Sequence, residues 1–220
     1  MHDADTLFWD LDGTSTDPYE GITRSVAYAL HFFDIEVPDR TVLCPFIGPP
    51  LKDSFMRFYG FSSADAELAI ARYRDYFAGK GLFENTVYPG IPSLLDALEN
   101  AGRRHVLATS KPGVFAERIL THFGLRRYFS AVAGSDLDGK RVKKEDVLRH
   151  ALELTNAKPA RSLMIGDREY DVAGARAVGM DCIGVTYGYG SEKELSDSGA
   201  VALADSPEAL RRLLLPSGPF

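Results

Sequence analysis

Near its N-terminus the chain carries the run Leu7-Phe8-Trp9-Asp10-Leu11-Asp12-Gly13-Thr14, an apolar stretch that ends in two carboxylates one residue apart. The apolar part predicts a buried strand, and Gly13 supplies a sharp exit from it. On an extended backbone Asp10 and Asp12 share a face and repel each other, a cost that a cation or a shared proton offsets. Taken alone, the pair is equally consistent with an acidic surface turn, so its meaning depends on the rest of the chain.

From about residue 90 onward, short apolar runs alternate with segments of helical periodicity, as in βαβ units. Strands are expected at 105–109, 129–133, 162–165 and 181–185, and helices at 91–100, 114–123, 144–155, 170–178 and 207–214. Alternation of this kind is typical of a parallel sheet covered by helices on both faces. The sequence therefore predicts an α/β fold with a Rossmann-like, three-layer core.

Residues 16–86 break this rhythm, because their apolar residues recur at helical spacing with few strand-like runs. We expect a small all-helical cap, inserted directly after the first strand. The predicted domains are a catalytic core of residues 1–15 and 87–220 and a helical cap of residues 16–86. Insertion at this point would place the cap over the carboxyl edge of the sheet, which is the position of a lid.

Composition narrows the class of protein further. The 220 residues are 45% hydrophobic, with a formal net charge of −6 and two cysteines outside any metal-binding or redox motif. No run approaches the roughly 20 apolar residues that span a bilayer, and no signal peptide is visible, so a cytoplasmic protein without membrane contact is expected. The acidic charge argues against nucleic acid as a partner, and a phosphorylated ligand would need a locally positive site.

The second predicted strand leads into hydroxyl groups. Thr109 and Ser110 precede Pro112 and a predicted helix. Hydroxyls and free amides at a helix N-terminus can bind a phosphoryl oxygen. Ordinary helix capping is the simpler explanation of these two residues considered alone.

Two further segments place charges at the ends of predicted elements. Residues 140–144 contain four cations, Lys140, Arg141, Lys143 and Lys144, just before a helix, where acidic residues are usual. This mismatch suggests a functional cation, although a solvated basic loop would look the same. After the strand at 162–165, Asp167 and Asp171 stand four apart, as a metal ligand and its supporting acid would.

Together these segments resemble the four motifs of the haloacid dehalogenase-like superfamily: Asp10-Leu11-Asp12-Gly13-Thr14, Thr109, Lys144, and Gly166-Asp167 with Asp171. The runs 46–51, 108–112, 134–139 and 187–190 are similar to its phosphoglycolate phosphatase-like branch. Ser15 departs from the pattern, because the family usually carries leucine there. Lys144 fits the family spacing better than Lys143 does.

The resemblance implies a Mg²⁺-dependent phosphatase that forms an aspartyl-phosphate. Asp10 would be the nucleophile, and Asp12 would protonate the leaving oxygen and later activate water. Mg²⁺ would be held by Asp10, Asp167 and the backbone carbonyl of Asp12, supported by Asp171. Lys144 would contact the phosphate, with its oxygens held by the pair Thr109 and Ser110.

The substrate is expected to be a small phosphorylated metabolite, with 2-phosphoglycolate first and a 5'-nucleotide or a sugar phosphate as alternatives. A phosphomutase and a non-catalytic regulatory domain are more remote. Candidate contacts in the cap are basic residues for a substrate carboxylate and aromatic residues for a base, although both sets also suit ordinary helices: Arg24, Lys52, Arg74, Tyr19, Phe46, Phe55 and Tyr59.

Overall fold

A computed structural model describes residues 4–137 and 141–215 of the chain. The chain divides into two compact units. The larger unit joins Met1–Thr16 to Val87–Phe220, and the smaller unit is the single segment Asp17–Thr86. One unit is therefore interrupted in sequence by the other.

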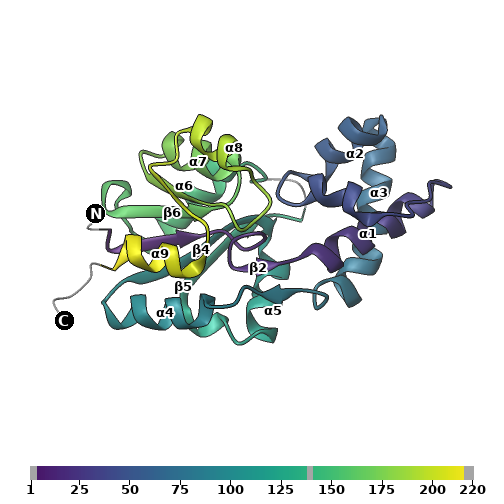
Figure 1. Cartoon of the computed structure of the whole chain (residues 1–220). Coiled ribbons are helices and arrows are strands. Elements are labelled where there is room, and N and C mark those ends of the chain that lie inside the picture. Colours follow the sequence, from purple (N-terminus) through teal and green to yellow (C-terminus); the bar gives the residue numbers. More distant parts are fainter. Residues whose placement is uncertain (1–3, 138–140, 216–220) are drawn as a thin grey trace. The chain divides into compact units, whose positions relative to one another are not determined.

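The larger unit is built on a six-stranded sheet with the order β5-β4-β1-β6-β7-β8, in which every neighbouring pair is parallel (Figure 1). Its strands are β1 (Thr6–Trp9), β4 (Arg104–Pro112), β5 (Phe129–Ser135), β6 (Ser162–Gly166), β7 (Asp181–Val185) and β8 (Ala202–Ala204). The first strand is central, with Thr6 in register with Arg104 on one side and Ser162 on the other. The parallel α/β core expected from the sequence is confirmed.

Helices cover both faces of this sheet. In Figure 1, α6, α7 and α8 lie on one face, and α4, α5 and α9 lie on the other. Their bounds are α4 (Ile91–Asn100), α5 (Gly113–His122), α6 (Lys144–Thr155), α7 (Glu169–Ala177), α8 (Glu192–Ser198) and α9 (Pro207–Leu214). The central strand β1 is buried at all four residues, as expected for a strand of a parallel sheet that is covered on both faces.

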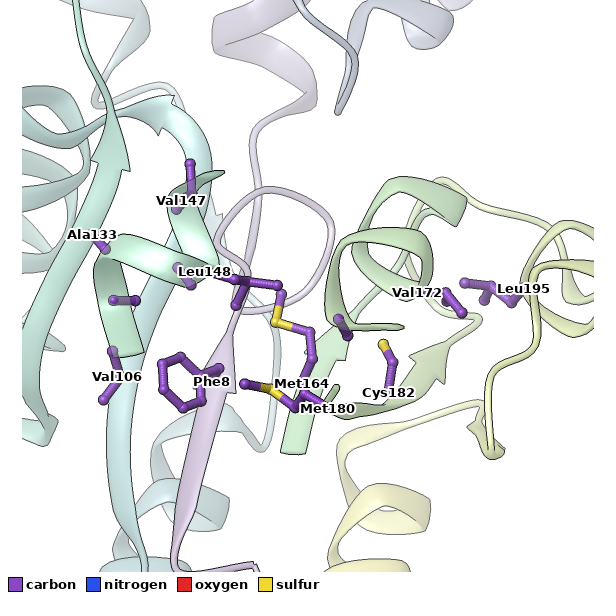
Figure 2. Close-up of a cluster of buried hydrophobic side chains, with 13 residues drawn as sticks. Phe8, Val106, Ala133, Val147, Leu148, Met164, Val172, Met180, Cys182 and Leu195 are labelled. Carbon is purple, nitrogen blue, oxygen red and sulfur yellow. The ribbon is translucent and has the colours of Figure 1, made fainter. Parts of the chain in front are cut away.

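The core between the sheet and α6 and α7 is a cluster of buried side chains (Figure 2). Phe8 of β1 packs there with Met164 of β6, and Leu148 and Val172 enter from the helices. Burial of apolar side chains of this size stabilises a fold by roughly 1.5–3 kcal/mol each. This cluster fixes the strand that carries Asp10 at its end.

The smaller unit is helical. Its main elements are α1 (Tyr19–His31), α2 (Leu51–Tyr59) and α3 (Ser63–Tyr76), with a 3₁₀ helix at Arg40–Phe46 and a π turn at Phe77–Gly81. The two chain crossings between the units, β2 (Thr16–Asp17) and β3 (Thr86–Val87), pair in a two-stranded ribbon.

The observed elements differ from the expected ones mainly near the carboxyl edge of the sheet. Strand β4 continues to Pro112, beyond the predicted end at Thr109, and both α8 and β8 were not predicted. Short elements such as β8 carry too few residues to show a periodicity. Across the described residues, none of the helices has the length and apolarity that a membrane span needs.

Candidate active site

The loop after β1 is held in shape by its own polar groups. Gly13 adopts a φ of +82°, which an L side chain rarely tolerates. The hydroxyl of Ser15 donates to the carbonyl oxygen of Asp10 at 2.8 Å. Thr14 donates from its hydroxyl to Oδ1 of Asp167 at 3.3 Å, which ties the loop to the end of β6. The departure from the family pattern at Ser15 thus supplies a hydrogen bond to the loop.

Three buried carboxylates meet at the carboxyl ends of β1 and β6. Asp10, Asp167 and Asp171 each offer an oxygen within 4.8 Å of the others. Burial raises the pKa of Asp167 well above its usual value, and the neighbouring Asp171 and Asp10 raise it further. Burial likewise raises the pKa of Asp171, although Lys144 opposes the effect. The cluster therefore lacks positive charge and would gain from a cation.

Lys144 supplies part of that charge. Its Nζ lies 2.8 Å from Oδ1 of Asp10 and 2.7 Å from Oδ1 of Asp171, and donates to the carbonyl oxygen of Ala108 at 3.0 Å. Burial alone would lower the pKa of Lys144, but Asp10 and Asp171 raise it overall. Lys143 is exposed at the start of α6, so Lys144 is the lysine of this pair that enters the acid cluster. Lys140 lies outside the described residues.

The end of β4 is irregular. Between Ala108 and Pro112 the strand advances four residues while β5 advances two, from Ala133 to Ser135. An irregularity of this kind re-aims the side chains that it contains. Here these are Thr109, which is buried, half-buried Ser110, and buried Lys111. The main-chain N–H of Lys111 donates to the Thr109 hydroxyl at 3.3 Å.

Asp12 has a different environment from the acid cluster. Its Oδ2 lies 2.9 Å from Nζ of Lys111, and both side chains are almost entirely buried. Burial raises the pKa of Asp12, while the Lys111 ammonium opposes the effect. Oδ1 of Asp12 accepts no hydrogen bond from any described residue. One carboxylate oxygen is thus paired, and the other is buried without a hydrogen bond from the described residues.

The loop that follows β7 closes on Asp167. Its main-chain N–H at Tyr189 donates to Oδ2 of Asp167 at 2.8 Å, and the hydroxyl of Tyr187 donates to the carbonyl oxygen of Thr14 at 2.9 Å. A Cβ at Gly188 would lie 2.2 Å from the carbonyl oxygen of Gly13, so only glycine permits this approach. Both oxygens of Asp167 are therefore oriented by hydrogen bonds.

The donor set fits a hard divalent cation. Buried carboxylate oxygens close to one another are the ligands that Mg²⁺ prefers, and the raised pKa values of Asp167 and Asp171 reflect first the burial of their charge and then the nearby carboxylates. The carboxylate of Asp12 is absent from this cluster, because it pairs with Lys111. A metal contact through Asp12 would use its backbone carbonyl, as the sequence led us to expect.

Sequence reasoning placed the main charged residues but missed several that hold them. Lys111, Ser15, Tyr187 and Tyr189 were not among the predicted site residues. For Lys111 a signal existed, since it stands two residues after Thr109 and would share its face on an extended strand. The loop contacts of Tyr187 and Tyr189 depend on tertiary packing and leave no such pattern.

In the smaller unit, two of the basic residues considered as contacts for a substrate carboxylate form ion pairs with acids of the same unit. Arg24 pairs with Glu20 at 2.7 Å and Glu84 at 2.8 Å, and Lys52 pairs with Glu67 at 2.6 Å.

The aromatic candidates of the smaller unit are packed. Phe46 and Phe55 are buried with ring centroids 5.0 Å apart, and Tyr59 lies 6.0 Å from Phe46. The guanidinium of Arg40 lies over the ring of Tyr19 at 5.8 Å from its centroid. These rings serve as a core of the unit.

The fold gathers this cluster of acids and lysines at the carboxyl edge of a parallel sheet, where open α/β folds bind their ligands. The family model for haloacid dehalogenase-like hydrolases matches residues 7–185. The chain belongs to this family, as its motifs indicated.

Individual relatives carry different activity names. A protein of Pseudomonas aeruginosa named 5'-nucleotidase is 49% identical over 94% of this chain and 94% of its own length. A phosphoglycolate phosphatase of Cupriavidus necator is 31% identical over 94% and 92%. The tyrosine-protein kinase PtkA of Mycobacterium tuberculosis is 41% identical over 84% of this chain, which spans only 62% of that protein.

Among solved structures, a predicted phosphatase from Clostridium acetobutylicum is 51% identical, with a TM-score of 0.94 over 97% of this chain and 99% of its own. Family and relatives together support the predicted enzyme class, a phosphoric monoester hydrolase.

Proposed function

We propose that this protein is a Mg²⁺-dependent phosphatase that hydrolyses a small phosphomonoester through an aspartyl-phosphate on Asp10. The observation that carries the proposal is the buried cluster of Asp10, Asp167 and Asp171 around Lys144. Much of the difficulty of phosphoryl transfer comes from charge, and catalysis depends on positioning and electrostatic stabilisation. This cluster offers a nucleophile, a fixed cation and carboxylates suited to a metal.

In the first step, a carboxylate oxygen of Asp10 forms a bond to phosphorus while the bond from phosphorus to the leaving oxygen breaks. Asp12 gives its proton to that leaving oxygen. In the second step, Asp12 takes a proton from the attacking water, which displaces the Asp10 carboxylate and releases inorganic phosphate. General acid–base catalysis of this kind contributes roughly 10²- to 10⁴-fold in rate.

The other residues of the site bind and orient. Thr109, Ser110 and Lys144 hold the non-bridging oxygens of the phosphoryl group. Asp10, Asp167 and the backbone carbonyl of Asp12 would hold Mg²⁺, with Asp171 in support. When bound, Mg²⁺ would neutralise charge on the phosphoryl oxygens and on the carboxylates around them.

For the substrate, the comparisons favour a nucleoside 5'-monophosphate over 2-phosphoglycolate, because the relative named 5'-nucleotidase is the more similar of the two. The phosphoglycolate phosphatase relative keeps 2-phosphoglycolate as a second candidate. We assign the choice between them to residues 16–86, acting as a cap, since the phosphoryl chemistry uses residues of the larger unit alone.

The test is phosphate release from nucleoside 5'-monophosphates, 2-phosphoglycolate and sugar phosphates, each with Mg²⁺ and with a chelator. We expect Mg²⁺-dependent release, greatest for a nucleoside monophosphate, and its loss in Asp10→Asn, whose neutral amide cannot form the acyl phosphate. Circular dichroism of this variant controls for folding.

A second experiment tests for kinase activity, because one relative is named a tyrosine-protein kinase. The protein is incubated with Mg²⁺ and ATP that carries a labelled γ-phosphate, and transfer of the label to protein tyrosine is measured. Label on tyrosine without phosphate release from any ester would contradict the proposal. So would substantial release by Asp10→Asn.

A further inference from the structure

The contact between Lys111 and Asp12 is the feature of the site that the proposed chemistry has not yet used. Nζ of Lys111 lies 2.9 Å from Oδ2 of Asp12, with side-chain exposures of 5% and 11%. A buried ion pair costs desolvation that its own attraction often fails to recover, so such a pair is weak grounds for a stabilising role. A role in orienting the carboxylate explains the pair better.

The fold places Lys111 here by two close approaches of the main chain. A Cβ at Gly134 of β5 would lie 2.5 Å from Cα of Gly113 and 2.6 Å from the carbonyl oxygen of Lys111. The lack of a side chain at Gly134 thus allows β5 to approach the end of β4 and the first residue of α5, beside the irregular stretch that carries Thr109 and Lys111. The position of the ammonium is determined by backbone packing.

The geometry also distinguishes the two oxygens of Asp12. The positive charge on Nζ of Lys111, 2.9 Å away, disfavours a proton on Oδ2 of Asp12, since an ammonium can only donate and cannot accept. A proton on this carboxyl group would then reside on Oδ1, which accepts no hydrogen bond from any of the described residues.

We propose that Lys111 is a positioning residue that holds Asp12 by Oδ2 and thereby presents Oδ1 to the leaving oxygen of the phosphoester. The inference rests on the proposed function, in which Asp12 is the general acid. Proton transfer runs from Oδ1 to the leaving oxygen, and the resulting carboxylate remains paired with Lys111 until water returns a proton.

The test compares Lys111→Met with wild type on phenyl phosphate and on 4-nitrophenyl phosphate, with kcat/KM as the readout because it reports formation of the aspartyl-phosphate. Nitrophenolate leaves without protonation, whereas phenolate needs it. We expect a loss on the order of 10²-fold for phenyl phosphate and of less than about tenfold for the nitro ester. Exposed Lys158→Met is the matched control and should change neither rate.

Asp12→Asn and the double variant Asp12→Asn/Lys111→Met extend the test, and remain informative if Lys111→Met alone folds poorly, because the double variant buries no unpaired charge. If Lys111 acts through Asp12, the second substitution adds less than about threefold to the loss in Asp12→Asn. Equal losses on both esters, or additive losses in the double variant, would overturn the inference. Absence of phosphatase activity in the wild type would instead contradict the proposed function.

Discussion

At the scale of single residues, Lys144 shows how the site handles charge. Its ammonium donates hydrogen bonds to Asp10 and to the carbonyl oxygen of Ala108, and it forms an ion pair with Oδ1 of Asp171 at 2.7 Å. In the proposed function the same ammonium also holds a phosphoryl oxygen. We expect the contact with Asp171 to lengthen then, because it is the one of the three that is not a hydrogen bond.

His105 is a buried titratable side chain on β4, away from the acid cluster. Its Nδ1 accepts a hydrogen bond from Nε1 of Trp9 at 3.0 Å, and the ring lies between Trp9 and Phe129. Burial lowers the pKa of His105 to about 4, from an ordinary value of 6.5. The folded protein therefore keeps this ring neutral.

This shift predicts a pH-dependent stability. Between about pH 6.5 and about pH 4 the unfolded chain binds a proton at His105 that the folded chain does not, so stability falls as the pH falls through this range. We expect the wild type to lose about 2 kcal/mol more than His105→Gln between about pH 7 and about pH 5.

Urea denaturation at the two pH values measures the difference, with exposed His122→Gln as the control. The raised pKa values of Asp167 and Asp171 act in the opposite direction, but equally in all three proteins, so they cancel in the comparison. An unchanged pH dependence in His105→Gln would contradict the assignment.

At the scale of elements, the contact between the ends of β4 and β5 determines where Lys111 lies, together with the hydroxyls of Thr109 and Ser110 that we propose bind phosphate. Gly134→Ala would place a methyl group within 2.6 Å of the carbonyl oxygen of Lys111 on β4 and of backbone atoms of Gly113 at the start of α5. Backbone atoms cannot move aside as a flexible side chain would. We expect a stability loss of roughly 1–3 kcal/mol and a greater than tenfold drop in kcat/KM.

The matched control is Gly79→Ala, at a position where a Cβ would meet nothing within 4 Å. Thermal denaturation and phosphatase kinetics on both variants provide the measurement. Normal kinetics in Gly134→Ala would show that the close approach is unimportant for the site.

The bounds of some helices and strands were predicted correctly from the sequence, and those of others were not. The helices at Ile91–Asn100, Lys144–Thr155 and Pro207–Leu214 follow the predicted bounds, since their apolar periodicity is complete. The extension of β4 to Pro112 was missed because hydroxyls and a lysine interrupt its apolar run. No role for Lys111 was predicted from the sequence, and its pairing with Asp12 was not foreseen.

The candidate site was predictable to a similar degree. Asp10, Asp167 and Lys144 were expected to meet because parallel strands end at one edge of the sheet, and their atoms lie together in the structure. Their catalytic roles stay predictions. What sequence could not supply is the orientation of each carboxylate, which depends on neighbours far along the chain, such as Tyr189 for Asp167.

At the scale of the whole molecule, the division into two units leads to a prediction: the larger unit carries out the phosphoryl chemistry, and the smaller unit selects the substrate. The crossings β2 and β3 pair with each other, so an exchange of residues 17–86 at these points preserves their ribbon. We expect the corresponding segment of the Cupriavidus necator phosphoglycolate phosphatase to raise the ratio of kcat/KM for 2-phosphoglycolate over nucleoside monophosphates by at least tenfold.

4-Nitrophenyl phosphate carries neither the carboxylate of 2-phosphoglycolate nor a nucleoside. Its rate of hydrolysis is therefore the control for an intact larger unit. A chimera that keeps the parental preference at an unchanged control rate would place selectivity in the larger unit.

The central position of β1 also governs when this protein can fold during its synthesis. Thr6 is synthesised before both of its sheet neighbours, Arg104 and Ser162, which lie much later in the chain. The apolar run that ends in Asp10 therefore stays without both sheet neighbours until the helical insert and the strands β4, β5 and β6 have been made. Asp10 and Asp12 follow this run directly, and charges beside an exposed apolar strand oppose aggregation, so the two acids also protect the nascent chain.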